Sequence, residues 1–281
     1  MKFDKSLDWK NTMSKSSINT YLICPLKWKY HYLDKLDEKM SIEADIGIKV
    51  HNALDKFYDK IDYDNEISVE YFFNILKEIE PDKNCLLFLE NFAKFEYNRY
   101  HSCINRGYDI KEYFIPTYRE KQCASTELGL NGIIDRVDRL DENTYCVIDI
   151  KTGVFKQSKI HFMRRELCIY ALLANAHPDI KENVTWVGGY FPRSNDVFFE
   201  KLGTRTINAT LRTVAKVKQD IKDKKFHAQP SRLCGWCSFT RICHDEKKYM
   251  WIKDQLKHWS FDKRFIKLSV TYSIDAIFSK R

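Results

Sequence analysis

The sequence predicts a mixed α/β (α+β) fold, in which a helical N-terminal region precedes a β-sheet flanked by helices. Apolar residues recur at spacings of three and four before residue 110, as they do along one face of a helix. Two β-rich runs around a turn follow at residues 128–140 and 145–153, and residues 186–191 have the composition of another strand. Helices that come first and strands that come later favour an α+β arrangement.

The N-terminal region contains a helix with one apolar stripe. The stripe consists of Ile46, Val50, Leu54, Phe57 and Ile61. His51 lies beside it, one turn after Gly47, whose missing side chain lets another group approach closely. A single histidine in such a place is more often a core residue than a ligand, whereas neutral imidazole binds Mn²⁺ when other ligands lie near it. The spacing leaves both interpretations of His51 open.

The two β-rich runs predict an antiparallel hairpin. Side chains alternate along a strand, so Asp149 and Lys151 share one face, about 6.5–7 Å apart. Asp135 lies opposite Asp149 if the loop has an odd length or contains a bulge, whereas a shift of one residue puts Ile150 opposite Asp135. Two carboxylates on neighbouring strands suit Mg²⁺ or Mn²⁺, and a nearby lysine can orient or deprotonate a water. The alternative is a surface hairpin with an incidental Asp–Lys pair.

The cysteine spacing predicts a metal centre that joins the two ends of the chain. Cys234, Cys237 and Cys243 form a dense group that apolar packing of cysteine does not require. Cys24, near the start of the chain, supplies a fourth thiolate. Four thiolates suit zinc or an iron–sulfur cluster, and zinc also accepts His244 in place of Cys24, so the spacing does not separate the metals.

The composition limits the classes of protein to which the chain can belong. The chain has 281 residues, a formal net charge of +8 and nine cysteines, an odd number with no secretory signal before them. The charge is compatible with a polyanionic partner, and the cysteine count favours a reducing intracellular compartment, the cytoplasm or a host cytoplasm if the protein is viral. No apolar run approaches the roughly 20 residues of a membrane span, so we expect no membrane association.

Six short motifs in order resemble the RecB-type branch of the PD-(D/E)XK nuclease superfamily. They resemble most its iron–sulfur members, which include the CRISPR-associated adaptation exonuclease and the AddB nuclease domain. The motifs are Cys24-Pro, Gly47-x-x-x-His51, Gly132-x-x-Asp135-Arg136, Asp149-x-Lys151-Thr-Gly, Glu166-x-x-x-Tyr170 and Cys234-x-x-Cys237-x5-Cys243. Each motif is weak alone, but the ordered set is specific to the family.

The resemblance implies a restriction-endonuclease-like mixed β-sheet core flanked by helices. It implies that His51, Asp135, Asp149 and the Ile150 carbonyl bind Mg²⁺ or Mn²⁺, while Lys151 supports the nucleophilic water. The expected catalytic set is Asp135, Asp149, Lys151, Glu166 and Tyr170. The resemblance also favours a structural [4Fe-4S] cluster over Zn²⁺ at Cys24, Cys234, Cys237 and Cys243.

One motif departs from the family pattern. Glu166 stands where the family usually has glutamine. Glu166 and Tyr170 are four residues apart and share a helix face, but a solvated glutamate and a core tyrosine would show the same spacing. Glu120, upstream of the hairpin, is either a further acidic helper or an exposed strand charge.

The expected divisions follow chain order. Residues 1–110 form a helical region carrying Cys24 and His51, 111–205 the nuclease core, 206–245 a lysine-rich helix with the cysteine cluster, and 246–281 a C-terminal extension of unknown role. The resulting expectation is an exonuclease that hydrolyses DNA at single-stranded ends in recombination, repair, phage replication or CRISPR spacer processing, with a helicase or recombination protein as partner. The alternatives are a non-catalytic DNA-binding or scaffolding module with a structural iron–sulfur or zinc cluster, and a zinc-stabilised regulator.

Overall fold

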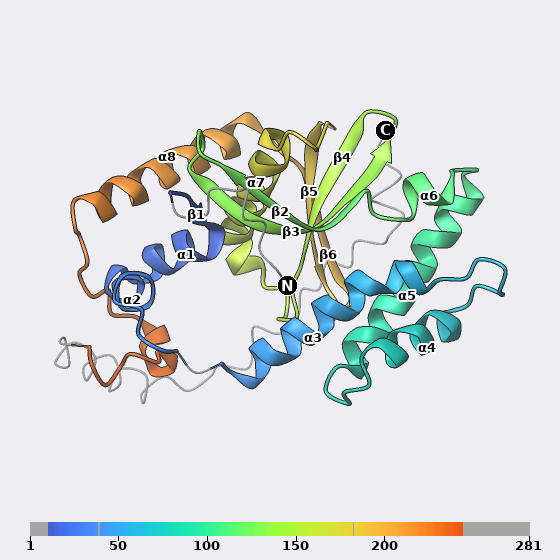
Figure 1. Cartoon of the computed structure of the whole chain (residues 1–281), viewed down its shortest axis with the longest axis horizontal. Coiled ribbons are helices and arrows are strands. Elements are labelled where there is room, and N and C mark those ends of the chain that lie inside the picture. The colour runs from blue at the N-terminus through green and yellow to red at the C-terminus, as the bar shows by residue number, and fades with distance from the viewer. Residues whose placement is uncertain (1–10, 39, 182, 244–281) are drawn as a thin grey trace. The chain divides into compact units, whose positions relative to one another are not determined.

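The computed structural model describes residues 11–38, 40–181 and 183–243 and divides into two compact units (Figure 1). The first unit includes residues 11–13 and 41–210 and contains a six-stranded sheet. The strand order is β1-β3-β4-β5-β6, and β2 also pairs with β3. The strands are β1 (Met13–Ser14), β2 (Tyr118–Ser125), β3 (Leu130–Asp141), β4 (Thr144–Ile150), β5 (Val184–Phe191) and β6 (Asp196–Lys201). The expected mixed sheet flanked by helices is confirmed.

One pair of strands makes the sheet mixed. β4 and β5 are parallel, whereas the pairs β2–β3, β3–β4 and β5–β6 are antiparallel. Parallel neighbours need a crossover connection, and α7 (Ile160–Ala176) supplies it and packs against β3, β4 and β5. Gly189 permits this packing, because a Cβ atom at that position would lie 3.1 Å from the sulfur of Met163.

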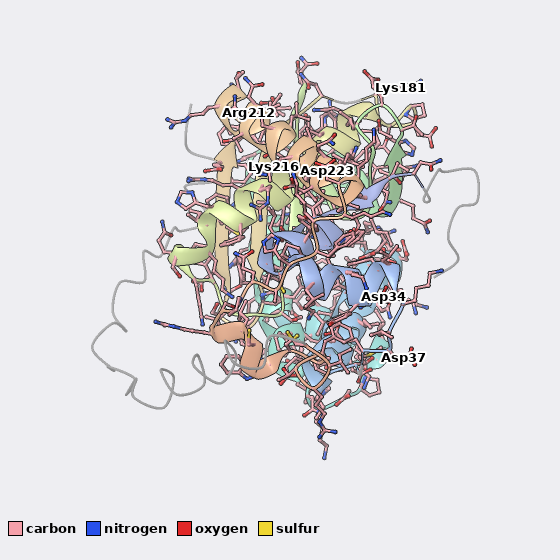
Figure 2. The ribbon with its side chains drawn as sticks, turned by 90° about the vertical axis from the view of Figure 1, so that its left-hand side faces the viewer. Asp34, Asp37, Lys181, Arg212, Lys216 and Asp223 are labelled. Atoms are coloured by element: carbon pink, nitrogen blue, oxygen red, sulfur yellow. The ribbon has the colours of Figure 1, made fainter. Side chains whose placement is uncertain are left out.

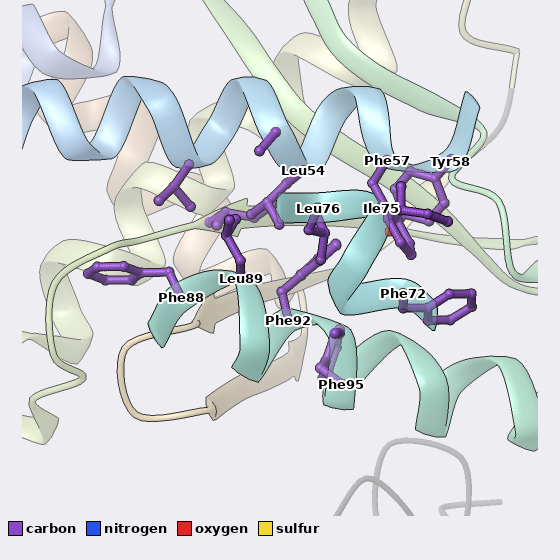
Figure 3. Close-up of a cluster of buried hydrophobic side chains, with 14 of the residues drawn as sticks. Leu54, Phe57, Tyr58, Phe72, Ile75, Leu76, Phe88, Leu89, Phe92 and Phe95 are labelled. Carbon is purple, nitrogen blue, oxygen red and sulfur yellow. The ribbon is translucent and has the colours of Figure 1, made fainter. Parts of the chain in front are cut away.

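A helical layer lies on the other face of the sheet. It comprises α3 (Ile42–Phe57), the 3₁₀ turn η2 (Tyr58–Lys60), α4 (Val69–Ile79), α5 (Leu86–Asn105) and α6 (Ile110–Tyr113). α3 begins at Ser41, whose hydroxyl accepts a hydrogen bond from the Ala44 N–H. The predicted stripe of α3 is buried at Val50, Leu54 and Phe57, which meet apolar residues of α4 and α5 (Figure 3). Ile150 and Tyr190 from the sheet join the same core.

Four buried charged side chains form ion pairs between β3 and α5. Arg136 donates two hydrogen bonds to Asp138 and one, of 2.9 Å, to Glu96. Arg99 pairs with the same two carboxylates, and the Tyr58 hydroxyl accepts from Arg136 at 2.8 Å. Since the two arginines balance the two acids, removal of any one group leaves a buried charge without its counterion.

We therefore expect Arg136→Met to lower the free energy of unfolding by about 3–5 kcal/mol, the range for breaking a buried ion pair. Arg139 is a matched control, because it lies on the same strand but pairs with the exposed Glu112, and Arg139→Met should cost about 1 kcal/mol or less. Chemical denaturation of both variants measures the difference. Equal losses would mean that the buried network contributes no more than a surface pair.

The second compact unit joins segments that are distant in the sequence, residues 14–40 and, among the described residues, 211–243. It contains α1 (Lys15–Ile23), α2 (Pro25–Trp28), the π-helical turn η1 (Lys29–Leu33), the 3₁₀ turn η4 (Arg232–Trp236) and most of α8 (Thr204–Lys222). Trp28 stacks on Phe226 with ring centroids 5.7 Å apart. The Tyr21 hydroxyl donates to the Lys225 carbonyl at 2.7 Å. The divisions expected in chain order, at residues 110, 205 and 245, stay a prediction. Residues 246–281 lie outside the described residues.

The lysine-rich stretch of α8 is less positive than its lysines suggest. Figure 2 shows charged side chains along this part of the chain, including Lys216 and Asp223. Asp220 accepts from both Lys216 and Lys225 at 2.9 Å, and Asp223 lies 3.1 Å from Lys225. Because these acids lie among the lysines, the local charge is partly neutralised within the segment.

Candidate active site

The centre of the candidate site is the β3–β4 hairpin. Arg136 pairs with Ile148, so the next positions, Asp135 and Asp149, stand opposite each other. A bulge at Leu140 shifts the register next to the turn. The expected register, in which a bulge brings Asp135 across from Asp149, is therefore confirmed.

His51 reaches this hairpin from α3. Its Nε2 atom lies 3.0 Å from the Ile150 carbonyl oxygen. Its Nδ1 atom lies 3.6 Å from Glu120 Oε1 and 3.8 Å from Asp135 Oδ2. Asp135 Oδ2 also accepts a 2.7 Å hydrogen bond from the Ile150 N–H. An imidazole, two carboxylates and a peptide carbonyl thus border one small hollow.

Glu120 reaches the hollow through an unusual backbone conformation. Its neighbours Arg119 and Lys121 pair with β3, but Glu120 itself does not, and its φ is +43°. A residue other than glycine in this region costs of order 1–3 kcal/mol, and such residues cluster at functional sites. The ligand atoms of His51, Glu120 and Asp135 all lie within 4.8 Å of one another. Glu120 was absent from the expected ligand set, because nothing in the sequence signals a positive φ there.

The neighbouring acids control the protonation of His51. Desolvation by its surroundings opposes the charged form, but the hydrogen bond to Glu120 and the charges of Asp135 and Asp149 outweigh it and raise the pKa of His51 above its ordinary value. In the metal-free protein the imidazole therefore holds its proton to a higher pH than a free histidine does. A metal ion competes with that proton for the same ring.

Lys151 is oriented by two acids. Its ammonium lies 2.8 Å from Asp149 Oδ2 and 3.1 Å from Glu166 Oε2. Its backbone N–H donates to the Tyr190 carbonyl at 2.9 Å, which holds the end of β4 against β5. Glu166 is thus neither remote from the hairpin nor simply solvated, since it reaches the lysine from α7.

Tyr170 lies one turn farther along α7 and is buried. It packs on Gly132, where a Cβ atom would lie 3.0 Å from the tyrosine ring. Burial, followed by the charges of Asp149 and Asp135, raises the pKa of Tyr170 well above its usual value, so the hydroxyl stays protonated. The glycine of the Gly-x-x-Asp motif therefore makes room for the tyrosine of the α7 motif.

The four predicted cluster ligands lie together in the second compact unit. Cys24, Cys234, Cys237 and Cys243 all line one cavity of about 240 Å³. The backbone N–H of Gln229 lies 3.5 Å from the sulfur of Cys24, and the backbone N–H of Ser231 lies 3.3 Å from the sulfur of Cys234. Burial raises the pKa of the Cys237 thiol. His244, the alternative zinc ligand, lies outside the described residues.

Oxygen and imidazole donors that converge beside a lysine define the type of site with which metal-dependent hydrolases cleave phosphate esters. Residues 12–244 match the family model of the PD-(D/E)XK nuclease superfamily. The chain belongs to this superfamily and is a metal-dependent nuclease. No curated protein is significantly similar to it. Among the helices of the described segments, none has the length and hydrophobicity of a membrane span.

Proposed function

We propose that this nuclease is a DNA exonuclease of the RecB-type iron–sulfur branch and that it hydrolyses single-stranded ends with Mg²⁺ or Mn²⁺. The observation that carries the proposal is the convergence of His51, Glu120, Asp135 and the Ile150 carbonyl beside Lys151. These donors fit the metal, since oxygen ligands suit Mg²⁺ and imidazole is accepted by Mn²⁺. A module that only bound DNA would gain nothing from carboxylates facing phosphate.

Each residue of the site has a distinct role in this proposal. His51, Glu120, Asp135 and the Ile150 carbonyl would hold the ion, and Asp149, which stands opposite Asp135, stays the further ligand that the family resemblance implies. A bound ion would supply Lewis acidity at the scissile phosphate and would lower the pKa of the attacking water. Lys151 orients that water and stabilises the negative charge that develops on the phosphate.

The residues of α7 act on this set indirectly. Glu166 accepts from the Lys151 ammonium together with Asp149, so the lysine is held from two sides. Tyr170 fills the space over Gly132 and keeps α7 at a fixed distance from β3. A carboxylate stands here where the family usually has glutamine, and it contacts the lysine.

The direct test of the function compares linear with circular single-stranded DNA in the presence of Mn²⁺ or Mg²⁺. We expect only the linear substrate to be degraded, because an exonuclease requires an end. Asp135→Asn serves as the inactive control. Degradation of circles would mean endonuclease activity, and an absence of Asp135-dependent cleavage by folded protein would favour the non-catalytic DNA-binding or scaffolding module.

We also propose that Cys24, Cys234, Cys237 and Cys243 hold a [4Fe-4S] cluster, because all four line one cavity. Its ligands come from both segments of the second unit, so a cluster would tie residues 14–40 to residues 211–243. Metal binding of this kind contributes directly to folding free energy. We propose a structural role for it, with Zn²⁺ as the alternative occupant.

Replacing a ligand should remove the cluster and lower the stability. We expect Cys237→Ser to lose iron and acid-labile sulfide and to unfold at a lower temperature than the wild type. Cys103→Ser is the control, because Cys103 is buried in α5 and lies outside the cavity. Metal analysis of anaerobically purified protein identifies the bound metal. Zinc without sulfide would mean that the site binds zinc and no iron–sulfur cluster. Equal metal content in both variants would mean that Cys237 is not a ligand.

A further inference from the structure

The segment that follows Lys151 is cationic and aromatic. No acidic residue occurs between Lys151 and Glu166, while the segment contains Lys156, Lys159, Arg164 and Arg165. It comprises a loop, the 3₁₀ turn η3 (Gln157–Lys159) and the first turns of α7. A run of cations without acids is suited to a phosphate backbone.

Both ends of this segment are anchored to the sheet. The Phe155 ring packs 5.2 Å from the ring of Phe191 at the end of β5. Arg164 Nε lies 2.8 Å from each carboxylate oxygen of Glu200 on β6. Arg164 is therefore occupied by a structural ion pair. Between these anchors, residues 156–159 and Phe162 are exposed in the part of the chain that the structure describes, whereas Met163 is buried.

The anchored segment presents apolar and charged side chains to solvent. Phe162 is 48% exposed and Val154 is 49% exposed. Lys156 and Lys159 are also exposed. The Arg165 guanidinium lies 5.2 Å from the centre of the Phe162 ring and packs over it. An exposed ring backed by a cation is a stacking platform for a nucleobase.

One face of α7 connects this platform to the candidate catalytic lysine. Phe162, Glu166 and Tyr170 are spaced by four residues and share that face. Glu166 lies 3.1 Å from the Lys151 ammonium. Phe162 thus lies four residues, about 6 Å, farther out along α7 than the residue that contacts the lysine. This separation suits the base of a nucleotide next to the scissile phosphate.

We infer that this platform is the surface that holds the substrate strand, an inference that rests on the proposed nuclease function. Phe162 stacks on one unpaired base of single-stranded DNA, and Lys156 and Lys159 contact the phosphates beside it. A base inside a duplex is already stacked on both sides, so the platform selects single strands. Arg164 is excluded from this role by its pairing with Glu200.

The test measures binding of fluorescent oligothymidine by anisotropy in EDTA, so that no cleavage occurs. Phe162→Ala should weaken binding by about 5- to 150-fold, the range for losing one base–aromatic stack. Phe162→Trp should retain the affinity. A control variant is Lys181→Ala, since Lys181 is exposed beyond the other end of α7 (Figure 2) and should have no effect.

Salt dependence tests the two lysines separately. The combined Lys156→Ala and Lys159→Ala variant should flatten the slope of log affinity against log salt by about 0.7 for each phosphate that these lysines neutralise in the wild type. An abasic nucleotide in the probe should weaken binding to the wild type and change nothing further in Phe162→Ala.

Three results would overturn the inference. The first is an unchanged DNA affinity in Phe162→Ala, and the second is an equal affinity of the wild type for duplex and single-stranded DNA. The third is a change in the molecular mass measured by sedimentation in Phe162→Ala with no change in DNA affinity, which would assign the surface to a second copy of the chain. The same experiments distinguish failure of this inference from failure of the nuclease proposal. Phe162-dependent DNA binding by a wild type that does not cleave DNA would support the binding surface and exclude the proposed nuclease activity.

Discussion

Lys151→Ala is expected to lower kcat for metal-dependent DNA cleavage by about 10²- to 10⁴-fold, the usual contribution of a positioned acid–base group. The Lys151 ammonium lies between Asp149 and Glu166, and the side chain is 35% exposed, so the variant should remain folded. Single-turnover cleavage by wild-type and variant protein measures the loss. DNA affinity in EDTA should change little.

Glu166→Gln is the matched variant for this prediction. It removes one acid from the lysine and installs the residue that the family usually has. Asp149 still lies 2.8 Å from the ammonium, so we expect a much smaller loss of kcat than in Lys151→Ala. A wild-type kcat in Lys151→Ala would show that the lysine has no role in catalysis. A loss in Glu166→Gln as large as in Lys151→Ala would give the carboxylate a role of its own.

Glu120→Gln is expected to weaken Mn²⁺ binding by at least about 10- to 100-fold, because loss of a charged ligand should cost no less than loss of a residue that only supports a ligand. The variant removes a charge from the group of ligand atoms that lie within 4.8 Å of one another. Isothermal titration with Mn²⁺ measures the affinity. Glu112→Gln is the control, because Glu112 is an exposed acid that pairs with Arg139 away from the hollow. Equal affinities in both variants would exclude Glu120 from the metal site.

The same variant should change the pH dependence of metal binding. The pKa of His51 is raised above its ordinary value, with Glu120 among the causes. A proton on the ring blocks the metal, so wild-type affinity should fall as the pH drops through this raised pKa. Removal of the Glu120 charge lowers that pKa, and the fall should move to lower pH in Glu120→Gln. A shift in the opposite direction would contradict the assignment of His51 as a ligand.

Local patterns predicted the parts of the fold that depend on periodicity. The stripe of α3 was predictable because Val50, Leu54 and Phe57 follow helical spacing, and all three are buried. The opposition of Asp135 and Asp149 was predictable because one register alone brings two carboxylates together. In each case a pattern within a few residues determined the arrangement.

Features that depend on distant residues could not be predicted in this way. Glu120 turns toward His51 through a positive φ that its side chain does not favour, so tertiary structure overrides local preference there. The burial of Arg136 depends on Glu96, forty residues away. The net charge around the α8 lysines depends on which acids pair with them. The sequence does not distinguish Asp220, which pairs with Lys216 and Lys225, from any other surface acid.

In the proposed site, His51, Glu120, Asp135 and the Ile150 carbonyl share one metal ion. Anomalous diffraction from crystals of the full chain soaked in Mn²⁺ tests it most directly. We expect a peak within coordination distance of these four groups, with the Lys151 ammonium beside it. A peak held instead by Glu80, Asp82 and Cys85, a second group whose ligand atoms lie within 4.8 Å of one another, with none at His51, would exclude His51, Glu120 and Asp135 as the ligands.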